Sequence, residues 1–243
     1  MRVSLIIPAY NEEAYIGGCL DSVIAHAPDE FFEIIVVDNA STDNTAKIAS
    51  AYPEVRVVHE PKKGLPSARE RGRLEASGDF LAYIDADTRM HSDWLPLAKK
   101  VFDKNPEAVS ISGPARYWDA GLWQRMVLEF FWWTSSPLMY RVVGYMIYGA
   151  HFIVKREALE KIGGFDTGIS FYGEDTDLAR RLSKVGKTVF RMDFYILSSA
   201  RRFKKEGIIK SNFVYTMNFL WPVIFNRPFT FVHKDIRSEK PNV

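Results

Sequence analysis

Short apolar runs alternate with amphipathic segments over the first part of the chain. The runs cover Val3–Ile7, Glu33–Val37, Val55–His59 and Phe80–Ile84. Runs of this length that stop at turn residues or acids are typical of buried strands. Between the runs, apolar side chains recur at helical spacing, as they do at Ile16, Leu20 and Val23. This spacing predicts helices over 13–26, 65–77 and 92–103, and a further helix that follows the turn at 41–45 and ends at about 51.

Strands that alternate with helices predict parallel βαβ units. We therefore expect an α/β fold with a mostly parallel, doubly wound sheet and helices on both faces. The loops after the four strands, at 9–12, 38–44, 62–67 and 85–87, then meet at one edge of the sheet. Open α/β sheets bind their ligands at the carboxyl ends of the strands, so this edge is the expected position of a site.

The second half of the chain has a different composition, because aromatic residues crowd the segment 121–148. Within it, Leu122, Met126 and Phe130 share one helical face. Trp and Tyr flanked by Arg are typical of a helix at a lipid surface, but a core helix explains the pattern equally well. The stretch 208–225 predicts an amphipathic C-terminal helix with the same two explanations. Other expected elements are strands over 109–112, 150–154, 188–191 and 195–197, and helices over 157–161 and 176–185.

The composition is that of an ordinary globular protein, with 47% hydrophobic and 26% charged residues. A length of 243 residues suits one large α/β domain or two small ones, and a net charge of +2 gives no case for a nucleic-acid partner. Cys19 is the only cysteine, which agrees with a reducing compartment. With no signal-peptide pattern and no charge-free apolar stretch of about 18 residues, we expect a cytoplasmic protein, with any lipid contact at the inner face of the membrane.

Two acids, Asp85 and Asp87, follow the fourth strand directly. In extended backbone, residues two apart point the same way, so both carboxylates can face one point. Hard oxygen ligands of this kind suit Mg²⁺ or Mn²⁺, often shared with the phosphates of a substrate. The alternative is that both acids belong to a solvated turn.

Aromatic, acidic and basic residues follow the other strands. Tyr10 could stack on a base, Asp38 could accept a hydrogen bond from it, and Lys63 and Arg69 could neutralise phosphates. Together they favour a nucleotide bound with a divalent metal, although each alone is also explained as an ordinary surface residue. Because no GxGxxG follows the first strand and no GxxxxGK[ST] occurs, neither a dinucleotide oxidoreductase nor a P-loop NTPase is supported.

Two further clusters lie late in the chain. Glu174 and Asp175 precede a predicted helix, whose dipole keeps carboxylates ionised and available as bases. Arg201 and Arg202 follow a predicted strand and could clamp a pyrophosphate or a lipid phosphate. Acids that merely favour a helix start, and a solvated basic edge, are the alternatives.

Five motifs carry a resemblance to a known family. They are VSLIIPAYNEEAYIG at 3–17, VVDNASTDNT at 36–45, YIDADT at 83–88, GGFD at 163–166 and GED at 173–175. In this order and rough spacing, the sequence resembles the family 2 inverting glycosyltransferases with the GT-A fold. The resemblance covers about residues 2–205. It implies a GT-A domain over 1–205, with a nucleotide-sugar half at 1–110 and an acceptor half at 111–205, followed by an amphipathic tail at 206–243.

The resemblance also implies roles for individual residues. Asp175 is expected as the catalytic base beside Glu174, and Asp85 and Asp87 as the ligands of Mg²⁺ or Mn²⁺. The expected nucleotide-sugar-binding residues are Pro8, Ala9, Tyr10, Glu12, Asp38, Lys63, Arg69, Asp85, Ala86, Asp87, Arg201 and Arg202. The expected acceptor-binding residues are Gly149, Gly163, Gly164 and Phe165.

The sequence departs from the family pattern at two places. Glu70 replaces the Asn of the common Ala-Arg-Asn-x-Gly motif, so any contact made by that Asn is in question. Many members have a late His that binds the metal, but the matching region here is Ser199-Ala200-Arg201. Arg201 and Arg202 then carry part of the phosphate charge, or the metal is held weakly. Because the Gln-x-x-Arg-Trp motif of processive members is absent, we expect transfer of a single sugar.

The function expected from these features is metal-dependent, inverting transfer of one sugar from a UDP- or GDP-sugar. The acceptor is expected to be a glycan or a lipid-linked molecule that offers a hydroxyl or a lipid phosphate. Two other functions remain open. One is nucleotidyl transfer, although 8–18 lacks the basic residues of a phosphate loop. The other is a catalytically inactive protein that binds nucleotide sugars at a membrane surface.

Overall fold

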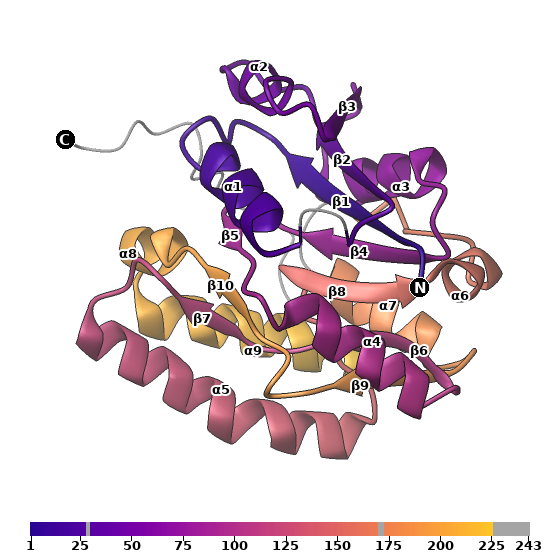
Figure 1. The fold of residues 1–243 in the computed structure, drawn as a ribbon. Coiled ribbons are helices and arrows are strands. Elements are labelled where there is room, and N and C mark those ends of the chain that lie inside the picture. Colours follow the sequence, from indigo (N-terminus) through magenta and orange to yellow (C-terminus); the bar gives the residue numbers. More distant parts are fainter. Residues whose placement is uncertain (28–29, 170–172, 226–243) are drawn as a thin grey trace.

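The computed structural model describes residues 1–27, 30–169 and 173–225. A seven-stranded sheet forms its centre, in the order β3-β2-β1-β4-β8-β6-β9 (Figure 1). The strands are β1 (Val3–Ala9), β2 (Glu33–Asp38), β3 (Val55–His59), β4 (Phe80–Ile84), β6 (Ala108–Ser112), β8 (His151–Lys155) and β9 (Lys187–Phe190). The expected α/β fold with a mostly parallel sheet is confirmed.

Strand β8 runs opposite to its two neighbours in this sheet. It pairs antiparallel with β4, with Ile84 opposite His151, and antiparallel with β6. The other four ladders of this sheet are parallel, and they join β3 to β2, β2 to β1, β1 to β4 and β6 to β9. The reversal has a consequence for the site, because it brings the start of β8 to the edge where β1, β2 and β4 end.

Helices cover both faces of the sheet, since alternate side chains of each strand enter one of two cores. In β4, Ala82 and Ile84 face one core, and Leu81 and Tyr83 face the other. The first core is closed by α1 (Ile16–His26), α2 (Thr45–Ala49) and α4 (Trp94–Lys104). The second is closed by α3 (Leu65–Glu75), α6 (Arg156–Lys161) and α7 (Glu174–Leu182). Strands buried on both faces explain why their sequences are continuously apolar.

A second, three-stranded sheet lies beside the first and supports the site. Its order is β5-β10-β7, formed by β5 (Thr88–Arg89), β10 (Ile196–Ser198) and β7 (Ala115–Tyr117). The short helix α8 (Arg201–Glu206) follows β10. Because β5 begins one residue after Asp87 and α8 begins three residues after β10, this small sheet brings the acidic pair and Arg201 together.

Two long helices, α5 (Leu122–Val143) and α9 (Ile208–Phe225), run next to each other along the lower side of the molecule (Figure 1). Among the described side chains, seven of the thirteen large exposed hydrophobic ones lie on α5. The face shared by Leu122, Met126 and Phe130 is therefore exposed and does not cover the sheet. Within the described ranges, no helix combines the length and apolar character needed to cross a bilayer. Residues 226–243 of the expected tail lie outside the described residues.

Candidate active site

One pocket opens at the sheet edge where β1 and β4 end. Its walls come from α3, the residues before β8, the start of α7, helix α8 and the long helices α5 and α9. The predicted residues that line it are Pro8, Glu12, Arg69, Asp85, Ala86, Asp87, Gly149, Glu174, Asp175, Arg201 and Arg202. Candidates for donor binding, metal binding and catalysis, from positions 8 to 202, thus share one cavity.

The acidic pair is joined to the late basic cluster by ion pairs. Arg201 Nε lies 2.9 Å from Asp87 Oδ2, and its two Nη atoms donate to the Glu12 carboxylate at 2.8 and 2.6 Å. The Glu12 side chain is 3% exposed, so this contact lies in the interior. Burial lowers the pKa of Arg201, but the charges of Asp87 and Glu12 outweigh it and raise that pKa. Glu12, expected to hold the nucleoside, is therefore the counter-ion of Arg201.

A second arginine, Arg69, connects the acidic pair to the predicted base. Its guanidinium lies 3.6 Å from Asp85 Oδ1 and 3.2 Å from Glu174 Oε1, and it donates to the Gly149 carbonyl at 2.6 Å. The side chain of Arg69 is 1% exposed. Arg69 reaches this position because α3 packs on β1 and β2, with its inner face toward the sheet. It therefore acts as a buried bridge between the two acidic clusters.

Glu174 and Asp175 form the first turn of α7 and share a desolvated environment. The pKa of Glu174 is raised, first by burial and then by the charge of Asp175, and Arg69 opposes this rise. Burial also raises the pKa of Asp175, although the Thr176 amide, which donates to Asp175 Oδ1 at 2.7 Å, lowers it. A carboxylate whose pKa is raised binds a proton more strongly, as a general base must do. Burial thus opposes the ionisation expected from the helix dipole, and both carboxylates line the pocket.

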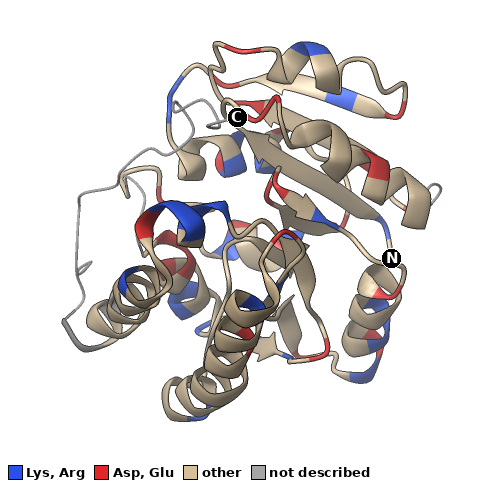
Figure 2. Ribbon diagram, turned by 90° about the vertical axis from the view of Figure 1, so that its left-hand side faces the viewer, with Lys and Arg blue, Asp and Glu red and all other residues tan. Residues whose placement is uncertain are grey.

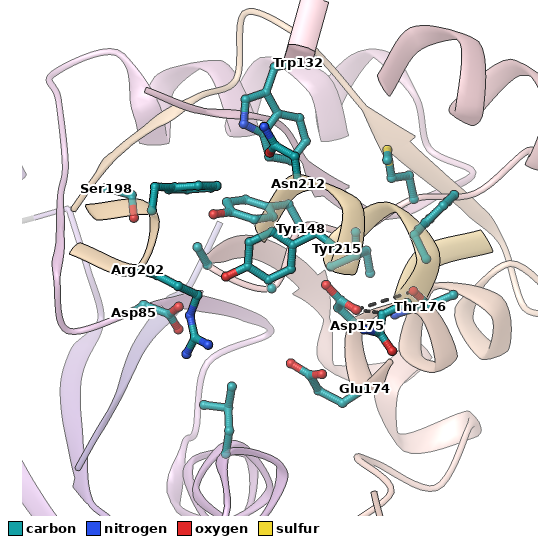
Figure 3. A pocket seen from close by; sticks show the side chains of 18 of the residues that line it. Asp85, Trp132, Tyr148, Glu174, Asp175, Thr176, Ser198, Arg202, Asn212 and Tyr215 are labelled. Carbon is teal, nitrogen blue, oxygen red and sulfur yellow. Dashed lines mark hydrogen bonds between the residues drawn. The ribbon is translucent and has the colours of Figure 1, made fainter. Parts of the chain in front are cut away.

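In Figure 3, Asp85 and Arg202 lie on one side of the pocket and Glu174 and Asp175 on the other. Tyr148 and Tyr215 lie between and above them. The pocket therefore has an acidic and basic floor and an aromatic roof.

The predicted nucleoside residues Ala9, Tyr10 and Asp38 do not line this pocket and lie at the ends of β1 and β2. Ala9 pairs with Asp38 in the sheet, so Tyr10 and Asp38 are neighbours. Lys63 Nζ donates to the Tyr10 hydroxyl at 2.9 Å and lies over its ring. Asp38 Oδ2 lies 3.2 Å from His59 Nδ1. These contacts group Tyr10, Asp38 and Lys63 at the ends of β1 and β2.

The predicted acceptor residues separate into two places. Gly149 lines the pocket, and a Cβ there would lie 3.3 Å from Arg69 and 3.5 Å from both Glu174 and Asp175. Gly163 and Gly164 form a turn with φ of 78° and 77°, which favours glycine. Phe165 is buried in the core against Tyr83 and donates its backbone N–H to Glu70 at 3.0 Å. Glu70, the departure from the family pattern, therefore holds this turn.

The metal prediction can be tested against the chemistry of the available ligands. In the described part of the chain, no group of three or more His, Cys, Asp or Glu side chains converges as a metal site. Mg²⁺ and Mn²⁺, however, are commonly held by one or two carboxylates together with substrate phosphates. Asp85 and Asp87 line the pocket, and the Asp85 side chain is 35% exposed. The residues fit a metal that is shared with a bound diphosphate.

Sequence reasoning missed the aromatic roof of the pocket. The pocket-facing side chains of α5 and α9, with Tyr148, are Phe131, Trp132, Ser135, Ser136, Met139, Tyr148, Asn212, Tyr215, Thr216, Asn218 and Phe219. The available signal was the second helical stripe of α5, in which Trp132, Ser136 and Met139 recur at spacings of four and three. The exposed stripe is equally apolar, so the pattern alone could not identify the inner face.

The profile of glycosyl transferase family 2 matches residues 4–163, and a profile described as the N-terminal domain of galactosyltransferase matches residues 131–206. The glycosyltransferase AglE of Haloferax volcanii is 38% identical over 99 residues, which is 38% of this chain and 33% of that protein. The probable glycosyltransferase YdaM of Bacillus subtilis is 30% identical over 203 residues, 76% of this chain and 47% of that protein.

A further relative, the glucosyl-dolichyl phosphate glucuronosyltransferase of Haloferax volcanii, is 25% identical over 187 residues. That match covers 72% of this chain and 59% of the relative, so the chain spans a third to three fifths of these proteins. Among solved structures, S. aureus TarS superposes with a TM-score of 0.67 at 20% identity, covering 93% of this chain and 73% of that one.

The mannosyltransferase PcManGT of Pyrobaculum calidifontis, solved with GDP-Man and Mn²⁺, gives a TM-score of 0.62 at 23% identity. The superposition covers 88% of this chain and 64% of that one. These two superpositions show the same GT-A fold. The family profile spans well over half of the chain, and the chain therefore belongs to glycosyl transferase family 2.

Proposed function

We propose that the protein is a glycosyltransferase that moves one sugar from a UDP- or GDP-sugar to an acceptor, with inversion at the anomeric carbon. One observation carries this proposal: Asp85 and Asp87 share a pocket with Glu174 and Asp175, and Arg69 bridges the two acidic clusters. A donor diphosphate at the first cluster and an acceptor hydroxyl at the second would meet inside one cavity. Family membership supports the same activity.

On the donor side, the nucleobase of the nucleotide sugar lies against the Tyr10 ring and donates a hydrogen bond to Asp38. The diphosphate lies at Asp85 and Asp87, within reach of Arg202. When bound between these carboxylates and the diphosphate, Mg²⁺ or Mn²⁺ supplies positive charge for the leaving group. The structure of the mannosyltransferase PcManGT, which has the same fold and was solved with GDP-Man and Mn²⁺, supports a divalent metal as the cofactor.

On the acceptor side, Asp175 takes the proton of an acceptor hydroxyl. The oxygen attacks the anomeric carbon from the face opposite the diphosphate, and the new C–O bond forms as the bond to phosphate breaks. Because no covalent intermediate with the protein intervenes, the configuration inverts. Glu174, held by Arg69, keeps the first turn of α7 in place beside Gly149.

The acceptor side of the pocket is built for an amphiphilic or ring-shaped molecule. Trp132, Tyr148 and Tyr215 form its roof, with Asn212 between the helices (Figure 3). Aromatic faces bind both sugar rings and hydrocarbon chains. A glycan or a lipid-linked acceptor fits this wall, and the dolichyl phosphate in the name of one relative favours the lipid-linked kind.

A panel of nucleotide sugars tests the donor class directly. With Mn²⁺ present, we expect a UDP- or GDP-sugar at 100 times its Kd to stabilise the folded protein by about 2.7 kcal/mol, which raises its Tm by several degrees. Asp87→Ala should remove the Mn²⁺-dependent part of this shift. Asp177→Ala, an acid on α7 that pairs with Arg180 and Arg181, is the control. Stabilisation by nucleoside triphosphates and by no nucleotide sugar would favour the nucleotidyltransferase alternative instead.

The exposed side of α5 supports a peripheral membrane contact. We define the outer α5 face as Leu122, Trp123, Met126, Phe130 and Trp133, whose exposed fractions run from 57% to 76%. Exposed basic residues lie on the same helix, at Arg125 and Arg141, and on α8 and α9, at Lys204, Lys205 and Lys210. Figure 2 shows the distribution of basic positions on this side of the molecule. Exposed aromatic side chains together with basic residues match the interface of an anionic bilayer.

Sedimentation with anionic vesicles at low salt tests this contact. We expect the protein to sediment with the vesicles, and Trp123→Ser combined with Trp133→Ser to weaken binding at least about tenfold. Leu74→Ser is the matched control, because Leu74 is 65% exposed but lies on α3. A protein that stays in the supernatant, or a double variant that instead converts a dimer to a monomer, would contradict the membrane contact.

A further inference from the structure

Arg201 lines the pocket beside Asp87, where the donor diphosphate is proposed to bind. Its guanidinium contacts both oxygens of Glu12 and one oxygen of Asp87, and it lies 4.6 Å from the centre of the Tyr15 ring. The side chains of Arg201 and Asp87 are only 16% and 13% exposed. These three residues, the Arg201 triad of Glu12, Asp87 and Arg201, come from chain segments up to 189 positions apart. The tertiary fold thus brings these three charged side chains together.

This geometry sets a positive charge directly beside a predicted metal ligand. A divalent ion at Asp87 would lie within a few Å of the guanidinium, where two positive charges repel each other. The repulsion is strong because the triad is largely shielded from water and salt. The Asp87 oxygen that Arg201 contacts must also give up its charge-assisted hydrogen bond, or share it, when the metal arrives.

We propose that Arg201 is the resident cation of the donor-phosphate site, and that it keeps the divalent metal from binding tightly until the donor diphosphate is present. The inference rests on the proposed function, since it assumes a nucleotide-sugar donor at this site. The diphosphate brings the negative charge that compensates both the guanidinium and the metal. Metal and donor then raise each other's affinity by the same factor, as linkage requires.

Mn²⁺ binding to the nucleotide-free protein tests this role without measuring turnover. Free Mn²⁺ is followed by its electron paramagnetic resonance signal as protein is added. We expect Arg201→Met to bind Mn²⁺ at least about tenfold more tightly than the unmodified protein, because the substitution removes the adjacent positive charge. Lys204→Met is the matched control for net charge, since Lys204 lies on the same helix and contacts Asp119. The control should leave Mn²⁺ affinity within about twofold of the unmodified protein.

The same titration with saturating UDP or GDP completes the test. The difference between Arg201→Met and the unmodified protein should shrink, because the diphosphate supplies the missing counter-charge. Equal Mn²⁺ affinity for a folded Arg201→Met protein and the unmodified protein, both without nucleotide, would overturn the proposal. A nucleotide sugar that still binds in that case leaves the proposed function intact, whereas the absence of any nucleotide or nucleotide-sugar binding contradicts the proposed function itself.

Removing Arg201 leaves two carboxylates together, so Arg201→Met is replaced by Arg201→Gln if circular dichroism shows that Arg201→Met is unfolded. The glutamine amide removes the charge but can still donate hydrogen bonds to Glu12 or Asp87. We expect the Mn²⁺ affinity of Arg201→Gln without nucleotide to rise at least about tenfold, as for Arg201→Met. No rise in a folded Arg201→Gln protein would also overturn the proposal.

Discussion

Asp175→Asn is expected to lower sugar transfer at least about a thousandfold while the affinity for the donor stays unchanged. Asparagine has the shape of aspartate and keeps an oxygen that can accept the Thr176 N–H, so the first turn of α7 should persist. It cannot take a proton from the acceptor, and the step that requires a base is lost. The proposed donor site at Asp85 and Asp87 lies across the pocket from this substitution.

Single-turnover transfer and donor binding by calorimetry measure the two effects separately. Asp177→Asn is the matched control, because Asp177 lies in the same first turn but pairs with Arg180 and Arg181. The control should retain transfer. If Asp175→Asn transferred sugar at the normal rate, Asp175 could not be the base, and Glu174 would be the next residue to test.

Arg69→Met should be among the most destabilising substitutions in the chain. Without the guanidinium, Glu174 loses its ion pair inside the protein, and Asp85 and the Gly149 carbonyl lose a contact. Removing one partner of a buried ion pair costs about 3–5 kcal/mol of unfolding free energy. The methionine side chain can fill the space but cannot compensate the acids.

Urea unfolding, followed by circular dichroism, measures this loss. Arg71→Met is the control, since Arg71 is on the same helix and its pair with Glu75 is a half-exposed one that is worth about 1 kcal/mol at most. The loss should also depend on pH. The pKa of Glu174 is raised in the folded protein, so folding takes up a proton and the unfolding free energy falls as pH rises toward that pKa. Removing Arg69 raises the pKa of Glu174 further, so the unfolding free energy of the variant falls more steeply and the loss grows with pH. A loss below about 1 kcal/mol would contradict the bridge.

Much of the first half of the fold was predictable because local pattern determines it. Strands β3 and β4 begin and end where the apolar runs predict. The carboxyl ends of β1, β2 and β4 meet at one edge, as parallel βαβ units require. Periodicity and turn residues carry this information, and the acidic pair after β4 follows from it.

The second half was less predictable, because its structure depends on contacts between distant segments. Strand β8 is reversed, and no local pattern encodes the direction of a strand. Helix α8 was missed since 201–206 is basic, with Phe203 as its one buried side chain. Strand β5 has two residues, too few for any periodic signal. Helix α7 begins at Glu174, two residues earlier than predicted, which places the acidic pair inside the helix.

The site shows the same division between local and distant information. The sequence indicated that Arg69, Glu12 and Arg201 belong near a nucleotide, and the structure brings all three to the pocket. It did not indicate their partners. Arg69 serves acids 16 and 105 positions away, and Arg201 pairs with Glu12 across 189 positions. Such pairings follow from topology, which short motifs do not contain.

The bridge made by Arg69 also limits how this protein can change over evolutionary time. Asp85, Glu174 and Arg69 share one network of charges centred on the buried Arg69, so the cost of replacing any of them depends on which residues occupy the other two positions. A neutral residue at Glu174 leaves Arg69 with less counter-charge, which changes the strength of the ion pair between Arg69 and Asp85. Single substitutions in this trio are therefore disfavoured even where a matched pair is tolerated. Natural variants should change these positions together or leave all of them unchanged.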